Sequence, residues 1–188
     1  MLQRRRAPVK NLSDALNEDG CPLCIVLKGF QACYLSELDR HEVDCLCGSH
    51  VWMVAKTAEA RSAATLFLRL LSNPLGQEAT ARTCDVCARI AQEEQQLIHE
   101  LLANVNRPDW EAWLRHHGAL CRPHALKVLG QAPKTAQGVI HLALSRRRAE
   151  LTQKLTDLLR HSDGNLPAQP GVLGRAAEYL TSQRGLHQ

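Results

Sequence analysis

Apolar residues recur along most of the chain at steps of three and four positions, which is the period of an amphipathic α-helix. The first such stripe runs from Val26 to Leu38 and predicts a helix that ends near Arg40. A second predicted helix covers residues 50–71. Several helix breakers follow in residues 72–83. They mark a boundary between two halves of the chain.

The second half predicts further helices that are separated by glycine and proline, over residues 86–105, 110–116, 125–129, 134–160 and 172–183. We find no βαβ pattern of the kind that a thioredoxin-like fold requires. Leucine far outnumbers isoleucine and only 4% of residues are aromatic, a balance that favours helices over sheets. We therefore expect an all-α fold.

Six cysteines and two histidines form four short motifs, each with two residues between its ends. The motifs are CPLC (Cys21, Cys24), CGSH (Cys47, His50), CDVC (Cys84, Cys87) and CRPH (Cys121, His124). Each half of the chain thus has one C-x2-C motif followed by one C-x2-H motif, and the second copy has the longer spacer. Repetition of this kind is hard to explain by the packing of small buried cysteines alone.

Two ligands separated by two residues can reach one ion from the same side of a turn, as structural zinc sites do. We expect two sites of three cysteines and one histidine, the first made by the motifs at residues 21–24 and 47–50. The second would be made by the motifs at residues 84–87 and 121–124. Four protein ligands fill a tetrahedron and leave no position for substrate, so closed sites of this kind are structural.

The third ligand of the first site has an alternative. Cys45 lies two residues before Cys47, and His41 is a further substitute. We choose Cys47 because only its spacing to His50 matches the second half. Cys33 lies on an apolar helix stripe, and we interpret it as a core residue.

At CPLC with its following helix, and at LCRPHALKVLG, the sequence resembles an uncharacterised prokaryotic family of helical proteins with repeated CPxC and CxxH motifs. The resemblance covers residues 18–160, and it departs from the family pattern at Asp85, where such motifs commonly have proline. It implies a helical fold with the eight ligands named above, and it supplies no activity.

These patterns predict four segments. Residues 1–20 form a basic N-terminal tail, and residues 21–72 form a first metal-binding helical repeat. Residues 84–160 form a second metal-binding repeat with the long helix, and residues 161–188 form a linker with a short C-terminal helix. The first twenty residues have no apolar stretch typical of a secretory signal, and no run is long enough to span a membrane. We therefore expect a cytoplasmic protein, where thiols stay reduced and serve metal binding rather than disulfides.

The formal charge is +4, and about −1 at each metallated site would lower it to roughly +2. No nucleophile with a base, phosphate loop or paired carboxylate motif appears, so we name no catalytic residue. The leading hypothesis is a non-catalytic zinc-binding scaffold or adaptor with two zinc ions that docks a protein partner through helical faces. The alternatives are a thiol-redox, metal-handling or iron–sulfur protein, and a nucleic-acid-binding regulator that uses arginines at residues 4–6 and 146–148.

Overall fold

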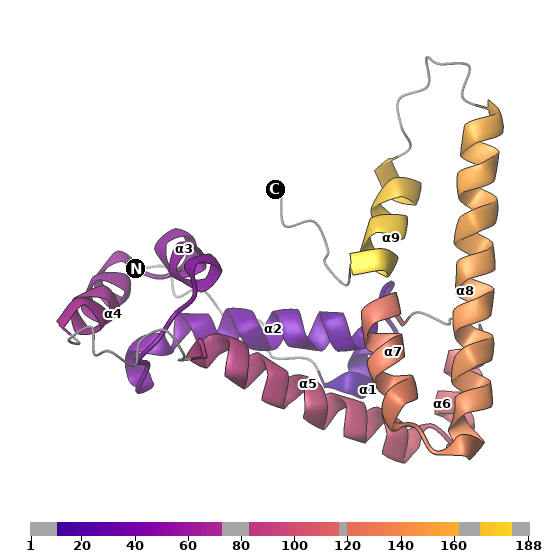
Figure 1. Ribbon diagram of the computed structural model, residues 1–188, viewed down its shortest axis with the longest axis horizontal. Helices are drawn as coiled ribbons and strands as arrows, with labels where there is room; N and C mark the ends of the chain where they lie inside the picture. The colour runs from indigo at the N-terminus through magenta and orange to yellow at the C-terminus, as the bar shows by residue number, and fades with distance from the viewer. Residues whose placement is uncertain (1–10, 73–82, 117–119, 162–169, 182–188) are drawn as a thin grey trace. The chain divides into compact units, whose positions relative to one another are not determined.

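A computed structural model describes residues 11–72, 83–116, 120–161 and 170–181 of the 188-residue chain (Figure 1). The described residues are helical and contain no strand, which confirms the predicted all-α class. In chain order the elements are α1 (Leu12–Ala15), α2 (Pro22–Ser36), the 3-10 helix η1 (Leu38–Arg40), α3 (Gly48–Thr57), α4 (Ala60–Ser72), α5 (Asp85–Asn104), α6 (Pro108–His116), α7 (Arg122–Gln131), α8 (Lys134–His161) and α9 (Pro170–Thr181).

Two compact units divide the described residues. Unit 1 lies within residues 27–95, and unit 2 lies within residues 11–26 and 96–181. The division therefore falls inside α2 and inside α5, and the first cysteine pair belongs to the same unit as the C-terminal helices.

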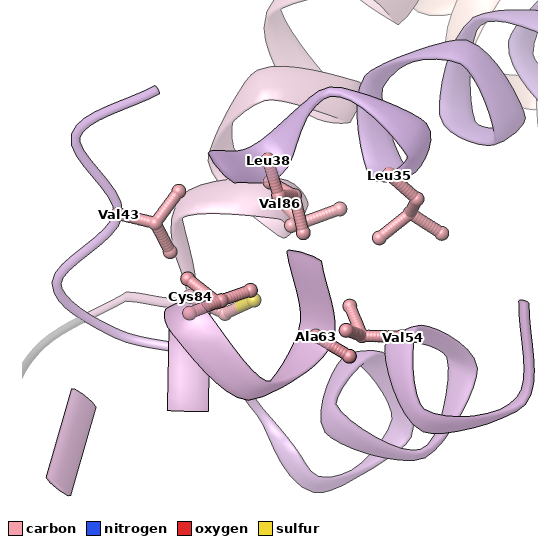
Figure 2. Close-up of a cluster of buried hydrophobic side chains, with 8 residues drawn as sticks. Leu35, Leu38, Val43, Val54, Ala63, Cys84 and Val86 are labelled. Atoms are coloured by element: carbon pink, nitrogen blue, oxygen red, sulfur yellow. The ribbon is translucent and has the colours of Figure 1, made fainter. Parts of the chain in front are cut away.

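The core of unit 1 is small and gathers short segments from several helices (Figure 2). It consists of eight buried residues, namely Leu35, Leu38, Val43, Val54, Ala63, Leu66, Cys84 and Val86. One of them, Cys84, is the first cysteine of the CDVC motif, so this motif is part of the core. Burial of these side chains is the main favourable term that holds the unit together.

The single helix predicted over residues 50–71 is instead two helices, α3 and α4. Ala58 leaves the helical conformation at φ −76° and ψ 156°, although no glycine or proline stands there. The break allows Val54 of α3 and both Ala63 and Leu66 of α4 to enter the same core. Tertiary burial has overridden the helix propensity of this segment.

Unit 2 is organised around the long helix α8, which α6, α7 and α9 contact (Figure 1). Buried residues on all of these helices form its core, namely Trp110, Trp113, Leu114, Ala125, Val128, Ala136, Ile140, Ala143, Leu151 and Val172. The predicted helix at residues 134–160 is confirmed as α8. The predicted short helix at residues 125–129 is longer than expected, because α7 begins at Arg122 and continues through Gly130.

The segment just before the first motif is not part of an exposed tail. Residues 12–15 form the short helix α1, in which Leu12 and Ala15 are completely buried. Asn11 caps this helix by accepting a hydrogen bond from the backbone of Asp14 at 2.7 Å. The indole of Trp113 donates a 2.6 Å hydrogen bond to the carbonyl of Leu16 and attaches α1 to α6.

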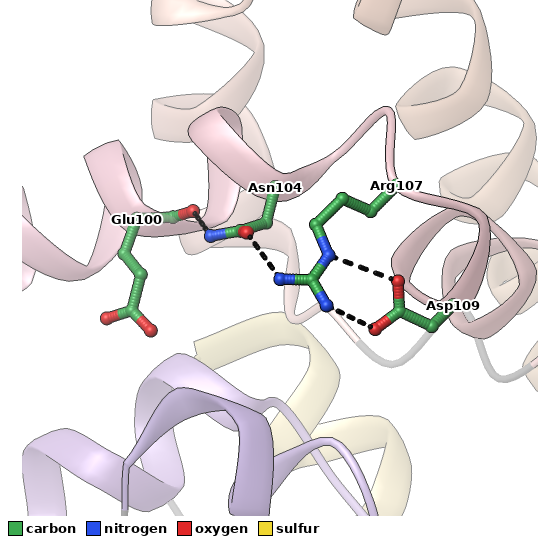
Figure 3. A network of polar contacts seen from close by, with 4 residues as sticks. All are labelled: Glu100, Asn104, Arg107 and Asp109. Atoms are coloured by element: carbon green, nitrogen blue, oxygen red, sulfur yellow. Dashed lines mark hydrogen bonds and ion pairs between the residues drawn. The ribbon is translucent and has the colours of Figure 1, made fainter.

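A polar network fixes the turn from α5 to α6 (Figure 3). Arg107 donates to Asn104 Oδ1 at 3.3 Å and to both carboxylate oxygens of Asp109 at 3.3 and 3.1 Å. Asn104 in turn donates to the carbonyl of Glu100 at 2.8 Å. Pro108 opens α6 at a position where its missing N–H leaves no helical bond unmade.

None of the described helices has a stretch of the length and apolarity that membrane crossing requires. Three predicted features lie outside the described residues: the basic cluster at residues 4–6, most of the boundary at residues 72–83, and most of the linker at residues 161–171.

Candidate metal centres

The four predicted motifs share one local structure. In each, the first cysteine immediately precedes a helix and the second ligand is the third residue of that helix. The carbonyl of each first cysteine accepts a hydrogen bond of 2.9–3.0 Å from the residue four positions later, namely Ile25, Val51, Ala88 and Ala125. Each motif is therefore a helix N-terminus, where backbone N–H groups and the helix dipole stabilise negative charge on sulfur.

The motifs combine in nested order rather than half by half. Quartet A consists of Cys21, Cys24, Cys121 and His124, and quartet B consists of Cys47, His50, Cys84 and Cys87. The expected pairing of residues 21–24 with 47–50, and of 84–87 with 121–124, is wrong. All eight predicted side chains nevertheless lie in one quartet or the other.

The distances within each quartet match a single tetrahedral ion. Tetrahedral zinc with Zn–S near 2.3 Å and Zn–N near 2.0–2.1 Å places two sulfurs about 3.8 Å apart, and sulfur about 3.6 Å from nitrogen. The observed sulfur pairs lie at 3.7 Å for Cys24 and Cys121 and at 3.9 Å for Cys47 and Cys87. The sulfur-to-Nδ1 distances to His124 and His50 are 3.1–3.5 Å.

Quartet A is well buried. Cys21 and Cys121 are each 2% exposed and His124 is 5% exposed, while Cys24 is half-buried. Gly20 has φ 117°, a left-handed conformation that favours glycine, and it directs the chain into Cys21. Burial lowers the pKa of His124, but hydrogen bonds with the thiolates of Cys121 and Cys21 outweigh burial and raise it to about 10.

Quartet B is more open. Cys84 and His50 are buried, Cys47 is half-buried, and Cys87 is exposed. Burial lowers the pKa of His50, which favours the neutral imidazole that a metal requires. The backbone N–H of His50 lowers the pKa of Cys47, as expected for a thiolate at a helix N-terminus.

One thiol in each quartet resists ionisation when no cation is present. Hydrogen bonds with Cys121 and Cys21 raise the pKa of Cys24 far above its ordinary range. Desolvation and hydrogen bonds with Cys84 and Cys47 raise the pKa of Cys87 to about 12. A cation at the centre of three sulfurs would favour the thiolate form of all three.

Cys45 and His41, the alternative ligands, lie outside both quartets. Cys45 takes part in a backbone junction, since its carbonyl accepts from the N–H of Asp85 at 3.0 Å. The Asp85 carboxylate accepts from the N–H groups of Asp44 and Cys45 at 2.8 and 2.9 Å. The ring of His41 stacks on Tyr34 at a centroid distance of 4.8 Å.

Sequence reasoning missed two residues that support quartet B. Asp85 joins the segment before Cys47 to the start of α5, and an acidic residue directly after a cysteine at a helix start was an available signal. Gln31 places its side-chain amide 3.1 Å from Nε2 of His50. No pattern pointed to Gln31, because it lies on another helix.

The fold and the two quartets define an all-α protein with two candidate metal-binding sites. No family model, curated protein or solved structure matches this chain.

Proposed function

We propose that the chain is a zinc-binding scaffold protein in which one zinc ion in each quartet fixes two helix N-termini together. The observation that carries the proposal is the gathering of all eight motif side chains into two groups at tetrahedral spacing. Thiolate and imidazole ligands in a tetrahedron are typical of zinc. A filled tetrahedron supports a structural role, with α2 and α7 joined at quartet A and α3 and α5 joined at quartet B.

The surroundings of quartet A are suited to its charge. Three thiolates around a divalent cation carry a net charge of about −1. Two helix N-termini face that charge, and Arg147 and Arg175 line the same small hollow as Cys21 and Cys121, together with the acidic Glu178. Positive groups beside thiolates favour the deprotonated form that zinc requires.

The spacing favours one ion per quartet over an iron–sulfur cluster. All four ligand atoms of each quartet lie within 4.8 Å of one another, whereas a cluster interposes several iron and sulfide atoms between its ligands. A metal analysis that measures both zinc and iron distinguishes single zinc ions from an iron–sulfur cluster. We expect zinc without iron, and therefore a colourless protein.

The adaptor part of the proposal rests on apolar side chains that helices leave exposed. In unit 1, Trp52 of α3 is 68% exposed and Leu71 of α4 is 81% exposed. The nucleic-acid alternative is weaker, because Arg146 donates to the carbonyl of Arg115 at 2.7 Å and Arg147 pairs with Glu150 at 3.0 Å. Two of the three central arginines thus serve the fold itself.

Docking is tested by the size of the protein in cell extract. We expect the wild-type chain to elute as a complex larger than its own 20.9 kDa, and a Trp52→Asp, Leu71→Asp variant to elute as the free chain. Free wild-type monomer in extract would contradict docking. A cytoplasmic location is part of the proposal, supported by eight cysteines that are all free of disulfides.

Metal content tests the central claim and the nested pairing together. We expect two zinc equivalents in the wild-type protein and one in a Cys24→Ser, Cys121→Ser double variant, because both changes fall in quartet A. Pairing by halves would instead cost both ions. Cys33→Ser, outside both quartets, is the control and should keep two zinc equivalents. A wild-type protein that contains no zinc, or iron in its place, would refute the proposal.

A further inference from the structure

The two quartets differ in the access that solvent has to their sulfurs. In quartet A the only half-buried cysteine is Cys24, and the sulfur 3.7 Å from its own belongs to the buried Cys121. In quartet B the exposed Cys87 lies opposite the half-buried Cys47, with 3.9 Å between the two sulfurs. Among the eight cysteines, all of which the structure describes, Cys87 alone is exposed.

We propose that Cys87 is a site of oxidative modification, at which a hydroperoxide converts Cys87 and Cys47 to a disulfide and releases the zinc ion of quartet B. The proposal rests on the proposed zinc-binding function. Accessible sulfurs with thiolate character are the ones that hydroperoxides oxidise, and zinc keeps its cysteine ligands as thiolates. Quartet A then serves as the permanent structural site.

The reaction balances in two steps. The thiolate of Cys87 attacks one oxygen of the hydroperoxide, breaks the O–O bond and becomes a sulfenic acid, and hydroxide or alkoxide leaves with the electron pair. The thiolate of Cys47 then attacks the sulfur of this sulfenic acid and expels hydroxide, which forms the S–S bond. The two sulfurs together lose two electrons, and the hydroperoxide gains them.

Loss of the metal follows from the ligand count. After the disulfide forms, Cys84 and His50 are the remaining ligands of quartet B, and two ligands do not hold zinc in a structural site. Cys47 is the partner with the best access, because Cys84, the other cysteine of the quartet, is buried in the core of unit 1. Thiol reductant with added zinc should reverse the reaction.

The test treats the zinc-loaded protein with hydrogen peroxide, follows released zinc with a chelating dye, and maps disulfides by peptide mass spectrometry. We expect one zinc equivalent to leave at least about tenfold faster than the other, together with a disulfide between Cys47 and Cys87. Cys24→Ser, which retains only quartet B, should keep the fast phase. Cys87→Ser, which retains only quartet A, should show the slow phase alone.

Cys45→Ser is the matched control for a neighbouring thiol outside the quartet, and it should keep both the fast phase and the disulfide. Three results would overturn the inference: equal release rates for the two zinc ions, a first disulfide between Cys24 and Cys121, or a fast phase that persists in Cys87→Ser. If the untreated protein still binds two zinc ions, the proposed function stands in each of these cases. An untreated protein without zinc contradicts the proposed function itself, and the inference with it.

Discussion

Each metal-site histidine turns Nδ1 toward its thiols, and this leaves Nε2 to other partners. In quartet B the partner is the amide group of Gln31, 3.1 Å from Nε2 of His50. The Gln31 atom at this distance is the amide nitrogen, which also donates to Sδ of Met53 at 3.4 Å. A histidine bound to a metal through Nδ1 carries a proton on Nε2, and exchange of the amide nitrogen and oxygen positions of Gln31 brings an acceptor to that proton. We therefore expect the amide of Gln31 to hold the ring of His50 in the orientation that binds metal.

We expect Gln31→Ala to weaken zinc binding at quartet B by about 10–100-fold, because the ring of His50 loses the contact that orients it. Competition with a chelator of known affinity measures the loss. Quartet A in the same molecule is the internal control, and its affinity should not change. Equal weakening of both quartets would show a general effect on folding instead.

Asp85 supports quartet B through the backbone. Its carboxylate accepts from the amides of Asp44 and Cys45, so Asp85→Ala removes the partner of two N–H groups. We expect a loss of about 1–3 kcal/mol in the stability of unit 1, measured by denaturant unfolding of the zinc-loaded protein. Asp109→Ala, at an exposed ion pair with Arg107, is the control and should cost less than about 1 kcal/mol. A control that loses as much as Asp85→Ala would contradict this role.

Residue spacing was enough to predict which eight side chains gather in the two quartets, because a C-x2-C or C-x2-H motif at a helix start can present both side chains on the same side of a turn. Spacing also favoured Cys47 over Cys45, and Cys47 is the one that lies in quartet B. The supporting residues Gln31 and Asp85 could not be found in this way. Their roles depend on contacts between segments far apart in the chain.

At the scale of helices, the sequence predicted the bounds of α5 and α8 closely. The apolar stripe is clear in α5, whereas α8 also leaves Leu142 and Leu159 exposed. Periodicity failed where burial of a few side chains decides the structure. Four residues are too few to show a helical period, so α1 was hidden in an apparent tail. The α3–α4 break was hidden because Ala58 is itself a good helix former.

The short helix α1 should matter more to stability than its length suggests. Leu12 is completely buried, and we expect Leu12→Ala to cost about 2–5 kcal/mol through lost burial and the cavity it leaves. Leu126→Ala on α7 is the matched control, because Leu126 is 58% exposed and should change stability by less than about 0.5 kcal/mol. Urea unfolding of the two zinc-loaded variants gives both values. Equal effects would mean that α1 does not pack as described.

At the scale of the whole molecule, the nested order of the motifs could not be read from the sequence. All four motifs have the same local structure, so any C-x2-C motif could share an ion with either C-x2-H motif. The choice depends on which helix N-termini the fold brings together. The longer spacer in the second half was the one sign that the halves are not simple copies. The consequence is a chain whose first cysteine pair and C-terminal helices belong to one unit.

The two units should depend on their metals to different degrees. The core of unit 1 has eight buried residues, and one of them, Cys84, belongs to quartet B. Unit 2 has more buried residues than unit 1, many of them on α6, α7 and α8. Most of these residues lie outside quartet A. A small core needs metal more than a large one, because the free energy of structural zinc binding is also free energy of folding.

We therefore expect Cys87→Ser, which removes the metal of quartet B, to lower the hydrogen-exchange protection of α3 and α4 at least about a hundredfold, as local unfolding would. Amides of α6 and α8 should keep their protection in this variant. Cys24→Ser, which removes the metal of quartet A, should leave most of the protection of α8 in place because Ile140 and Ala143 are buried against neighbouring helices. Cys33→Ser keeps both metals and sets the baseline. Protection lost evenly over both units in Cys87→Ser would show that the chain unfolds as one body, and that the metal of quartet B supports all of it.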